Sequence, residues 1–495
     1  MKKIIWWLCL ILMIPVFFSN AVFFVQNSWA QADSAGDSEL TEEDELEGFG
    51  DEKFEEGTNV FEEIEVKLPV PVSVESKGYS YGGFFREEWA YSFQEQDPNL
   101  NFVRKGPELS KVRSIVNAYL EQDLSENWKL KVSGNAFYDA YYSVKDRDLY
   151  PYETLRVLES EAEFRDTFIE GPLTDFLWLK IGRQIIAWGE SEGPAITDIA
   201  NPRDNREMGV VDIEDARIPV FATKFSFLKE GWEFNVVFIH EFRANKIGAK
   251  GSDYDPYISI RKNFDIETEK FPESHLSNTE FLYRLFKSFN GGDISVTYAD
   301  VFEDDAYLDF DKRSFRLIPR YRRIQAHGVA GNYVVGSWLL KFEFARKNGL
   351  AFVRDDIAKQ LQNKEDHPES WSEKNVTQGM IGFDYNGVTD LTTTFEIGGI
   401  RINDYEHNLS NDEIRASPSL ILMYDAWNNT LHPKFFWVRL PNDNGDLFRF
   451  TVDYDYVDAL QLSAGVIVYD ASKKEDLLYS FRNNDQILAS LKYSF

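Results

Sequence analysis

The chain has 495 residues, a formal net charge of −30 and a single cysteine. A chain this acidic is not expected to bind nucleic acid, which proteins contact through basic surfaces. The cysteine, Cys9, lies in the apolar N-terminal stretch, so the rest of the chain excludes disulfides, cysteine nucleophiles and cysteine-ligated metals.

The N-terminus has the pattern of a secretory signal. Lys2 and Lys3 precede a mostly apolar stretch from Ile4 to Val25, and Ala30-Gln31-Ala32 forms a small-x-small cleavage site. We predict a signal peptide over 1–32. An uncleaved anchor is the alternative, because an apolar run of about 20 residues is long enough to span a bilayer.

The next segment, 33–77, differs in kind from the rest. Residues 33–66 carry 15 acidic residues and one lysine, and a proline-containing linker follows at Pro69 and Pro71. Such a block of like charge favours disorder. It is either a solvated tail or a periplasmic docking segment for a basic partner, such as a carrier protein or an inner-membrane permease.

From residue 78 onward, stretches of alternating apolar and polar residues are separated by turn residues, which indicates consecutive β-strands. No later run of 18 apolar residues occurs, and aromatics are abundant. This combination favours a transmembrane antiparallel β-barrel, which is apolar on its outer face only. We predict about eighteen strands, with sixteen also consistent, at 79–93, 111–124, 128–143, 156–169, 175–188, 217–228, 231–243, 278–289, 292–303, 314–329, 331–346, 376–386, 390–404, 414–428, 431–441, 446–457, 459–470 and 482–495.

The C-terminal stretch DQILASLKYSF alternates to the last residue, and its apolar face includes Tyr493 and Phe495. A last strand of this kind resembles the recognition strand of bacterial outer-membrane proteins. We therefore expect these two residues to form the signal for the barrel-assembly machinery.

The predicted connections alternate in length. Those after odd-numbered strands are mostly long, and those after even-numbered strands are mostly short. Barrels in the bacterial outer membrane have short periplasmic turns and long external loops. The pattern therefore predicts a protein of the bacterial outer membrane, in contact with its lipid, with the N-terminal segment in the periplasm.

If the aromatic side chains face lipid, the charged residues that alternate with them face the lumen, because charge is costly on a lipid face. This reasoning predicts lumen-lining charges at Glu159, Glu161, Glu163, Arg165, Arg320, Arg322 and Arg449. They either form acidic and basic walls of a selective channel or neutralise each other in a filled barrel.

An enzyme is not indicated. The six histidines are dispersed, no HExxH or G-x-S-x-G motif occurs, and no cofactor or metal site is expected. The acidic stretches 253–256 and 442–446 are more typical of turns than of calcium loops.

The stretch GRQIIAWGES, residues 182–191, ends the predicted strand 175–188. We expect Trp188 to sit in the aromatic belt at the external interface. Residues 189–216 should fold inward as a constriction or plug. Arg183 should point into the lumen and pin this loop by pairing with Glu190, Asp204 or another carboxylate.

GRQIIAWGES followed by NPRD resembles a proteobacterial family of outer-membrane barrels of unknown function, which carries a "GRQ…WGE" strand end and an "NP.D" loop. The matching residues are Gly182, Arg183, Gln184, Trp188, Gly189, Glu190, Asn201, Pro202 and Asp204. The resemblance is sharp only here and covers most of 78–495, and the acidic segment is not something the family requires. Its genes often neighbour lipid-carrier-like periplasmic proteins and RND-type permeases, which implies transport of hydrophobic or lipid-like molecules.

Three functions remain open. The first is an outer-membrane transport barrel that moves hydrophobic or lipid-like cargo with periplasmic partners. The second is a stand-alone aqueous porin or exporter for small polar or acidic solutes. The third is a surface scaffold or adhesin that presents the long loops 244–277 and 347–375.

Overall fold

The computed structural model describes residues 78–145, 147–193, 196–211, 213–273, 275–363, 368–440, 445–471 and 477–495. All of them belong to the compact unit Pro71–Phe495. The predicted signal peptide, 1–32, and the acidic segment, 33–77, lie outside the described residues.

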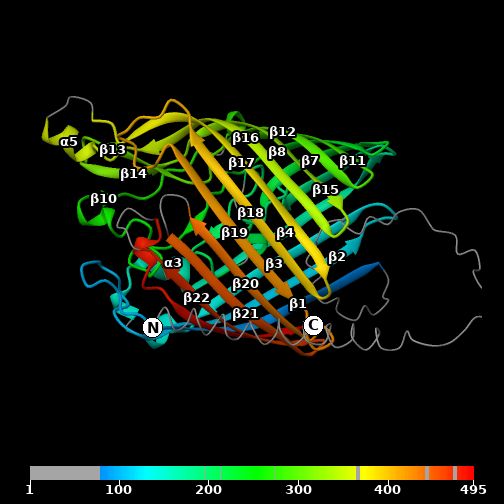
Figure 1. The fold of residues 1–495 in the computed structure, drawn as a ribbon, viewed down its shortest axis with the longest axis horizontal. Helices are drawn as coiled ribbons and strands as arrows, with labels where there is room; N and C mark the ends of the chain where they lie inside the picture. The colour runs from blue at the N-terminus through cyan, green and yellow to red at the C-terminus, as the bar shows by residue number, and fades with distance from the viewer. Residues whose placement is uncertain are drawn as a thin grey trace, which may run out of the picture. The chain divides into compact units, whose positions relative to one another are not determined.

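Eighteen strands form one closed antiparallel sheet, as the sequence predicts (Figure 1). The last strand closes the barrel on the first, with Tyr493 opposite Phe85 and Ala489 opposite Trp89. The strands are β1 (Tyr79–Ser92), β2 (Glu108–Asp123), β3 (Lys129–Asp139), β4 (Ser160–Thr174), β5 (Leu177–Gln184), β7 (Val220–Lys229), β8 (Trp232–Ile239), β11 (Glu280–Phe289), β12 (Gly292–Phe302), β15 (Arg323–Val335), β16 (Trp338–Val353), β17 (Trp371–Val388), β18 (Leu391–Ile402), β19 (Ile414–Tyr424), β20 (Leu431–Leu440), β21 (Gly445–Val457), β22 (Leu460–Asp470) and β23 (Gln486–Ser494).

Smaller elements lie in the connections. Two further sheets contain β10 (Asp265–Ile266), β13 (Tyr307–Asp311) and β14 (Arg316–Arg320), and β6 (Asp204–Asn205) with β9 (Lys246–Ile247). The helices are α2 (Tyr141–Val144), η1 (Arg147–Leu149), α3 (Tyr152–Leu158), α4 (Ile213–Ala216), η2 (Ile260–Lys262), η3 (Leu276–Asn278), α5 (Ile357–Gln362) and η4 (Leu477–Phe481). No helix among the described residues is long and apolar enough to cross a membrane.

The alternation of the strands separates two faces, as β16 shows. Phe342 and Phe344 are exposed on the outside, whereas Lys341 and Glu343 between them are buried inside the barrel. Successive side chains of a strand point to opposite faces, so the same alternation around the ring gives an apolar outer surface and a lumen with polar and charged walls. Tyr493 and Phe495 at the end of the chain are exposed.

The sequence misplaced one hairpin. The predicted strands 314–329 and 331–346 correspond to β15 and β16, which begin several residues later, and residues 316–320 form β14 in a separate sheet. The turn lies at Gly336, which has a φ of +60°. Gly331 is in mid-strand, where a Cβ would lie 2.6 Å from the Asp293 carbonyl oxygen. Its glycine therefore reflects close packing of strands and not a turn.

Two other predicted boundaries were wrong near the lumen. The start of the predicted strand 156–169 is helical, because α3 extends to Leu158. The predicted strand 175–188 ends earlier, at Gln184, and residues 185–188 already belong to the connection that follows.

Gly182, the first residue of GRQ, has a backbone requirement that predicts the effect of a substitution. Its φ is +135°, and an added Cβ would lie 2.2 Å from the Thr167 carbonyl oxygen. Gly182→Ala is expected to lower the free energy of unfolding by about 1–3 kcal/mol. Gly134→Ala on β3 is the control, because its Cβ would meet nothing closer than 3.5 Å. Denaturant titration of both variants checks this, and equal stability would contradict it.

Candidate functional site

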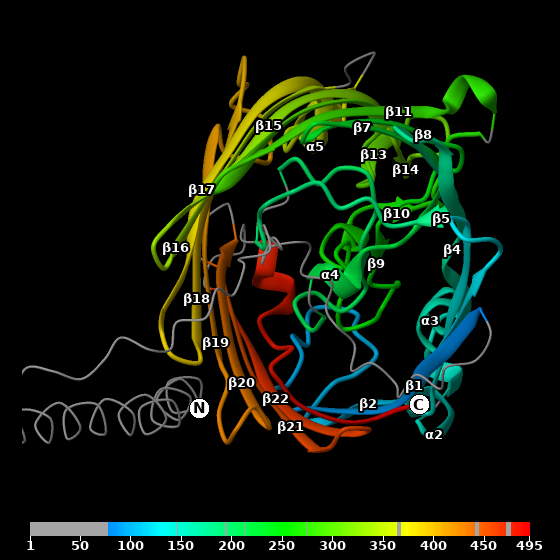
Figure 2. The ribbon, with the colours of Figure 1, turned by 90° about the vertical axis from the view of Figure 1, so that its right-hand side faces the viewer.

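The connection between β5 and β7, residues 185–219, runs inside the ring of strands, and we call it the inner loop. Figure 2 shows this part of the chain, with α4, surrounded by the barrel wall. Its described residues contact inward-facing side chains from several parts of the wall. This loop contains the predicted constriction, 189–216.

Asn201, from the NPRD motif, ties the two ends of the inner loop together. Its side-chain oxygen accepts from the Ile186 amide at 2.6 Å, and its side-chain nitrogen donates to the carbonyls of Ile218 at 2.8 Å and Gln184 at 3.3 Å. Asn201 is buried. One side chain therefore satisfies backbone groups that no strand partner reaches.

A second fastening inside the loop is ionic. Asp198 lies 2.9 Å from both Arg203 and Arg217. Together with Asn201, these contacts fold residues 186–218 into a closed unit that can pack against the wall as one body.

The first turn of the inner loop packs on an apolar part of the wall. Trp188 is 5% exposed and, with Ile186, belongs to a buried cluster that includes Val237, Leu282 and Ala299 on β8, β11 and β12. The prediction that Trp188 lies in an external aromatic belt was wrong. The strand ends at Gln184, so the chain turns inward before it reaches the tryptophan.

Two buried wall carboxylates hold the segment after Trp188. Glu343 on β16 accepts from the backbone amides of Glu190, Ser191 and Thr197 at 2.6–2.8 Å. Glu396 on β18 accepts from the Ser191 hydroxyl at 2.7 Å and the Gly193 amide at 3.0 Å.

The charges of these carboxylates are partly balanced within the wall. Lys341 lies 3.0 Å from Glu396 and 2.9 Å from Asp384. The side chain of Glu190 accepts from Asn332 at 3.0 Å. Hydrogen bonds to charged acceptors are the stronger ones, so this segment is firmly attached to β15–β18.

The acidic wall on β4 binds cations from two loops. Glu161 lies 2.7 Å from both Arg206 and Lys246, and Glu163 lies 2.7 Å from Arg243. Arg206 also donates to Asp204 at 2.9 Å, and Arg165 donates to the Arg217 carbonyl at 2.9 Å. These charges neutralise one another and brace the loops against the wall.

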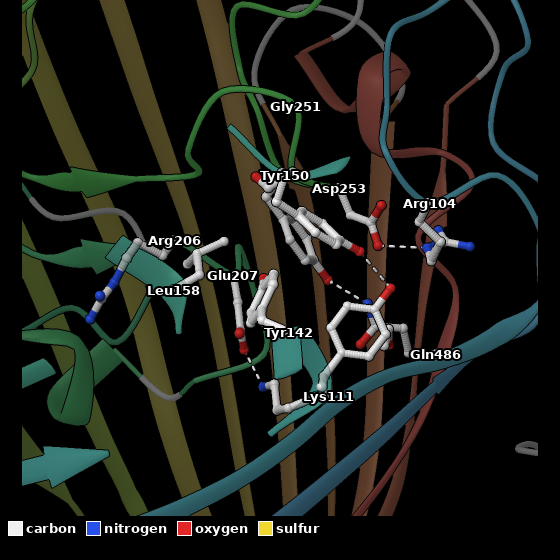
Figure 3. A pocket seen from close by; sticks show the side chains of 14 residues that line it. Arg104, Lys111, Tyr142, Tyr150, Leu158, Arg206, Glu207, Gly251, Asp253 and Gln486 are labelled. Carbon is white, nitrogen blue, oxygen red and sulfur yellow. Dashed lines mark hydrogen bonds and ion pairs between the residues drawn. The ribbon is translucent and has the colours of Figure 1, made fainter. Parts of the chain in front are cut away.

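Glu207 attaches the loop to β2. Arg113 donates to it at 2.7 Å, and Lys111 forms a second, shorter contact. Figure 3 shows Lys111 and Glu207 in a pocket whose lining includes four tyrosines. The space is about 40 Å³, room for a few water molecules. It is lined by Arg104, Ser110, Lys111, Tyr141, Tyr142, Tyr150, Leu158, Arg206, Glu207, Gly251, Ser252, Asp253, Tyr254 and Gln486.

The next residues of the inner loop reach β21 and β22. Arg449 donates to the carbonyls of Gly209 and Val210, at 3.1 and 2.8 Å, and Tyr469 donates to the Met208 carbonyl. Met208 and Val210 pack on an apolar cluster. It consists of Val438, Leu447, Ile467 and Tyr469 from the wall, Ala471, Leu478 and Phe481 from the connection between β22 and β23, and Tyr254 from a neighbouring loop.

Several predicted site residues lie elsewhere. Arg183 pairs with Glu241 at 3.1 Å and not with Glu190 or Asp204. In the sheet it is opposite the exposed Phe221, whereas Gln184 is opposite the buried Val220. Arg183 therefore faces outward, and the prediction that it points into the lumen was wrong. The strand ends one residue later, at Gln184, so Arg183 still belongs to the barrel wall and does not reach the loop that it was expected to hold.

Three charges predicted on the lumen wall belong to connections instead. Glu159 follows α3 and pairs with Arg147. Arg320 lies on β14 near Asp309, and Arg322 precedes β15 and pairs with Glu373. The misplaced strand boundaries explain all three.

The sequence analysis did not identify the wall carboxylates Glu343 and Glu396 as site residues. The stretch LKFEFAR does indicate that Glu343 faces the lumen, because Lys341 and Glu343 alternate with aromatic residues. Nothing in the sequence indicates that backbone amides from residues 190–197 would bind it.

Within the described ranges, no group of three or more histidines, cysteines and acidic residues is arranged to hold a metal ion.

A family model described as "Protein of unknown function (DUF1302)" matches residues 21–495. The chain belongs to this family. The matched span begins before the acidic segment and includes it. No curated protein matches the chain.

Solved structures with a similar arrangement include outer-membrane proteins of low sequence identity. OccAB3 of Acinetobacter baumannii is 11% identical, with a TM-score of 0.49 over 84% of this chain and 99% of that chain. OccAB1 of the same organism is also 11% identical, with a TM-score of 0.49 over 85% and 98%. OmpF of Salmonella typhi, in a complex with daunomycin, is 8% identical, with a TM-score of 0.40 over 84% and 97%.

The Asn201 contacts predict how the inner loop of this DUF1302 member responds to truncation. Asn201→Ala leaves buried backbone groups unpaired, which costs about 1–3 kcal/mol for each group. The inner loop is expected to become more sensitive to protease while the barrel stays folded. Asn386→Ala, at an exposed position near the end of β17 where Asn386 contacts Thr392, is the control. Limited proteolysis followed by mass spectrometry locates the cuts, and an inner loop as resistant as in the wild type would contradict the assignment.

Glu207 gives a pH prediction. Burial acts to raise the pKa of this carboxyl, but Arg113 and Lys111 outweigh burial and lower the pKa from 4.5 to about 2. A depressed pKa contributes stability that is present above pH 4.5 and is lost as the pH falls toward 2. The Tm difference between the wild type and Glu207→Gln should therefore be constant from pH 7 to 5 and shrink below pH 4.5. A difference that persists unchanged at pH 2 would contradict this.

Proposed function

We propose that this protein is a transport channel of the bacterial outer membrane, with its N-terminal segment in the periplasm, and that the inner loop narrows its path. The closed barrel with an apolar outer surface and charged inner walls supports this. Further support comes from the inner loop, which binds β16 and β18 at one part of its length and β2, β4 and β21 at another.

We propose hydrophobic or lipid-like molecules as the cargo. The observation that carries this is an apolar contact inside the barrel, where the partly exposed Met208 and Val210 of the inner loop pack on the buried Val438, Leu447 and Ile467 of the wall. A pore for water and small polar solutes has a polar interior. Apolar side chains at the constriction therefore favour a cargo with an apolar part.

Periplasmic partners belong to the same proposal. The acidic segment 33–66, with aromatic residues among its acids, has the composition of a segment that docks on a basic carrier or permease. Deletion of 33–66 is expected to lower cargo accumulation in cells and to leave barrel assembly unchanged. Normal accumulation by the deletion variant would contradict the docking role.

A second candidate, passage of small polar or acidic solutes, is favoured by cations on the lumen side of the strands. Lys180 is opposite Lys224 on β5 and β7, and Lys492 is opposite Arg86 on β23 and β1. Glu170 lies 3.4 Å from Lys180 and Glu88 lies 3.4 Å from Arg86, so each pair keeps a part of its positive charge, which would attract anions. Planar-bilayer recordings distinguish the candidates, because an aqueous porin gives discrete, anion-selective conductance steps and a path closed to ions gives none.

The two wall carboxylates provide a test of the constriction. Replacing both Glu343 and Glu396 by Gln removes the charges that hold residues 190–197, and each charge-assisted hydrogen bond contributes about 1.5–3 kcal/mol. The double variant should admit larger solutes in liposome swelling than the wild type. Glu373→Gln is the control, because Glu373 pairs with Arg322 outside the inner loop. An unchanged size limit would show that the inner loop does not set the width of the path.

A further inference from the structure

An arginine stands on the outer surface of the barrel, on the side that faces lipid. Arg346 on β16 alternates with the exposed Phe342 and Phe344, whereas its neighbours in the chain, Ala345 and Lys347, are buried inside. Successive side chains of a strand point to opposite faces, so Arg346 belongs to the outer face.

The neighbouring strands place polar side chains beside Arg346. His327 on β15 and Thr377 on β17 are directly opposite it, and Arg401 on β18 is opposite Thr377. These three also face outward, because the residues next to them in the chain are buried inside, namely Ala326, Val376 and Ile402. We call His327, Arg346, Thr377 and Arg401 the outer row. It crosses the four adjacent strands β15 to β18 (Figure 1), so its two arginines are about 10 Å apart at Cα.

The positive charge of the outer row is only partly balanced. Arg346 donates from Nε to the Asn348 side chain at 3.3 Å, and it forms no ion pair with any residue in the described ranges. Arg401 pairs with Glu413 at 3.3 Å, but both side chains of this pair are exposed, and exposed pairs are weak. The outer row therefore keeps a net positive charge and has N–H groups available for an anion.

The outer row lies near one edge of the apolar band. At the other edge, Trp338 on β16 follows the short turn at Gly336, and its ring centroid is 4.4 Å from that of Tyr385, as in an aromatic belt. Arg346 is eight residues further along β16, which is about 26 Å along the strand and about 20 Å in height at a tilt of about 40°.

This height corresponds to the level of lipid head groups. The apolar band of such barrels is about 25 Å tall, and the long side chain of an arginine can extend to its edge. Short turns face the periplasm in barrels of the outer membrane. The outer row therefore lies at the head groups of the outer leaflet.

The wall below the outer row offers a surface for acyl chains. Phe344, Ile381 and Ile397 are exposed there on β16 to β18. Between them, Gly379 and Gly399 are opposite each other, and a Cβ on either would meet no atom closer than 3.7 Å. An acyl chain can therefore lie against the backbone of β17 and β18, bordered by apolar side chains.

We propose that the outer row binds the phosphate of an outer-leaflet lipid, whose acyl chains lie on the apolar wall below. Guanidinium groups match phosphate in charge and geometry, and the spacing of Arg346 and Arg401 allows both to contact one head group. A charge on a lipid-facing wall is unfavourable, and a phosphate beside it offsets that cost. This inference goes beyond the proposed transport function and rests only on its placement of the barrel in the outer membrane.

Binding of diphosphoryl lipid A, an acylated disaccharide with two phosphates, tests the site. The full chain is purified in dodecyl maltoside micelles, and native mass spectrometry measures the lipid-bound fraction at each lipid concentration. The comparison lipid has the same acyl chains and no phosphate. We expect the wild type to bind the diphosphoryl form about tenfold or more tightly than the comparison lipid. Equal binding of the two lipids overturns the proposal.

Substitutions locate the site. Arg346→Gln should weaken binding of diphosphoryl lipid A about tenfold, and adding Arg401→Gln should weaken it further, because each removes a charge-assisted contact. Binding of the comparison lipid should not change, and Arg346→Lys should retain most of the affinity. The control, Arg316→Gln, removes an exposed arginine from β14, which belongs to a separate sheet, and should bind as the wild type does. If the double variant does not assemble, Arg346→Gln alone decides.

Three further outcomes would contradict the proposal. Unchanged binding of diphosphoryl lipid A by the Arg346 variant places the phosphate elsewhere, and equal weakening for both lipids shows that the charge has no specific role. Displacement of lipid A by an equal concentration of inorganic pyrophosphate shows a site for a free anion and not for a lipid. The assay involves no transport, so a variant that loses lipid binding and keeps normal cargo uptake supports the lipid site and leaves the transport function standing.

Discussion

Backbone amides bound to buried wall carboxylates are the constraint on which the interior of this barrel depends. Glu343 is 2% exposed and Glu396 is fully buried, and together they accept hydrogen bonds from the segment 190–197. A carboxylate removed from water needs such donors. The amides of the inner loop therefore supply the hydrogen bonds that the wall carboxylates need, and the carboxylates supply acceptors for those amides. Burying either set without the other would be unfavourable.

The rest of the interior follows the same rule with side chains in place of amides. The acids of β4 meet Arg206, Arg243 and Lys246 from the loops, and the cations of β2 meet Glu207. Removing one member of such a buried pair is costly, because its partner is left uncompensated. Apolar contacts between the inner loop and the wall occur in two further places, at Ile186 and Trp188 and at Met208 and Val210.

The sequence predicted the barrel because its signals are local. Alternation along each strand, the short and long connections and the aromatic C-terminus all follow from period 2 and from the demands of lipid on one face. These signals predicted about eighteen strands, with sixteen also consistent, and placed Tyr493 and Phe495 on the apolar face of the last strand. The predicted strand boundaries were wrong where a residue type has two structural roles. Glycine is typical of turns, but Gly331 lies in mid-strand, where it allows close packing of the strands.

The candidate site was harder to predict, because its contacts join residues far apart in the chain. Asn201 and Glu190 were recognised as parts of a motif, but their partners are the ends of the loop and the distant Glu343 and Asn332. Trp188 illustrates the difficulty most clearly. An aromatic at a strand end is typical of a membrane belt, and only the early end of β5 places it inside.

The placement of the inner loop on the wall is the central claim, and a single cross-link tests it most directly. A Cβ at Gly193 would lie 3.3 Å from the Cβ of Ser419, close to the separation in a disulfide. Gly193→Cys with Ser419→Cys should therefore form a disulfide spontaneously in intact membranes, detected as a linked peptide by mass spectrometry. Two free thiols that react independently would show that the loop does not lie on β19 and would contradict this account.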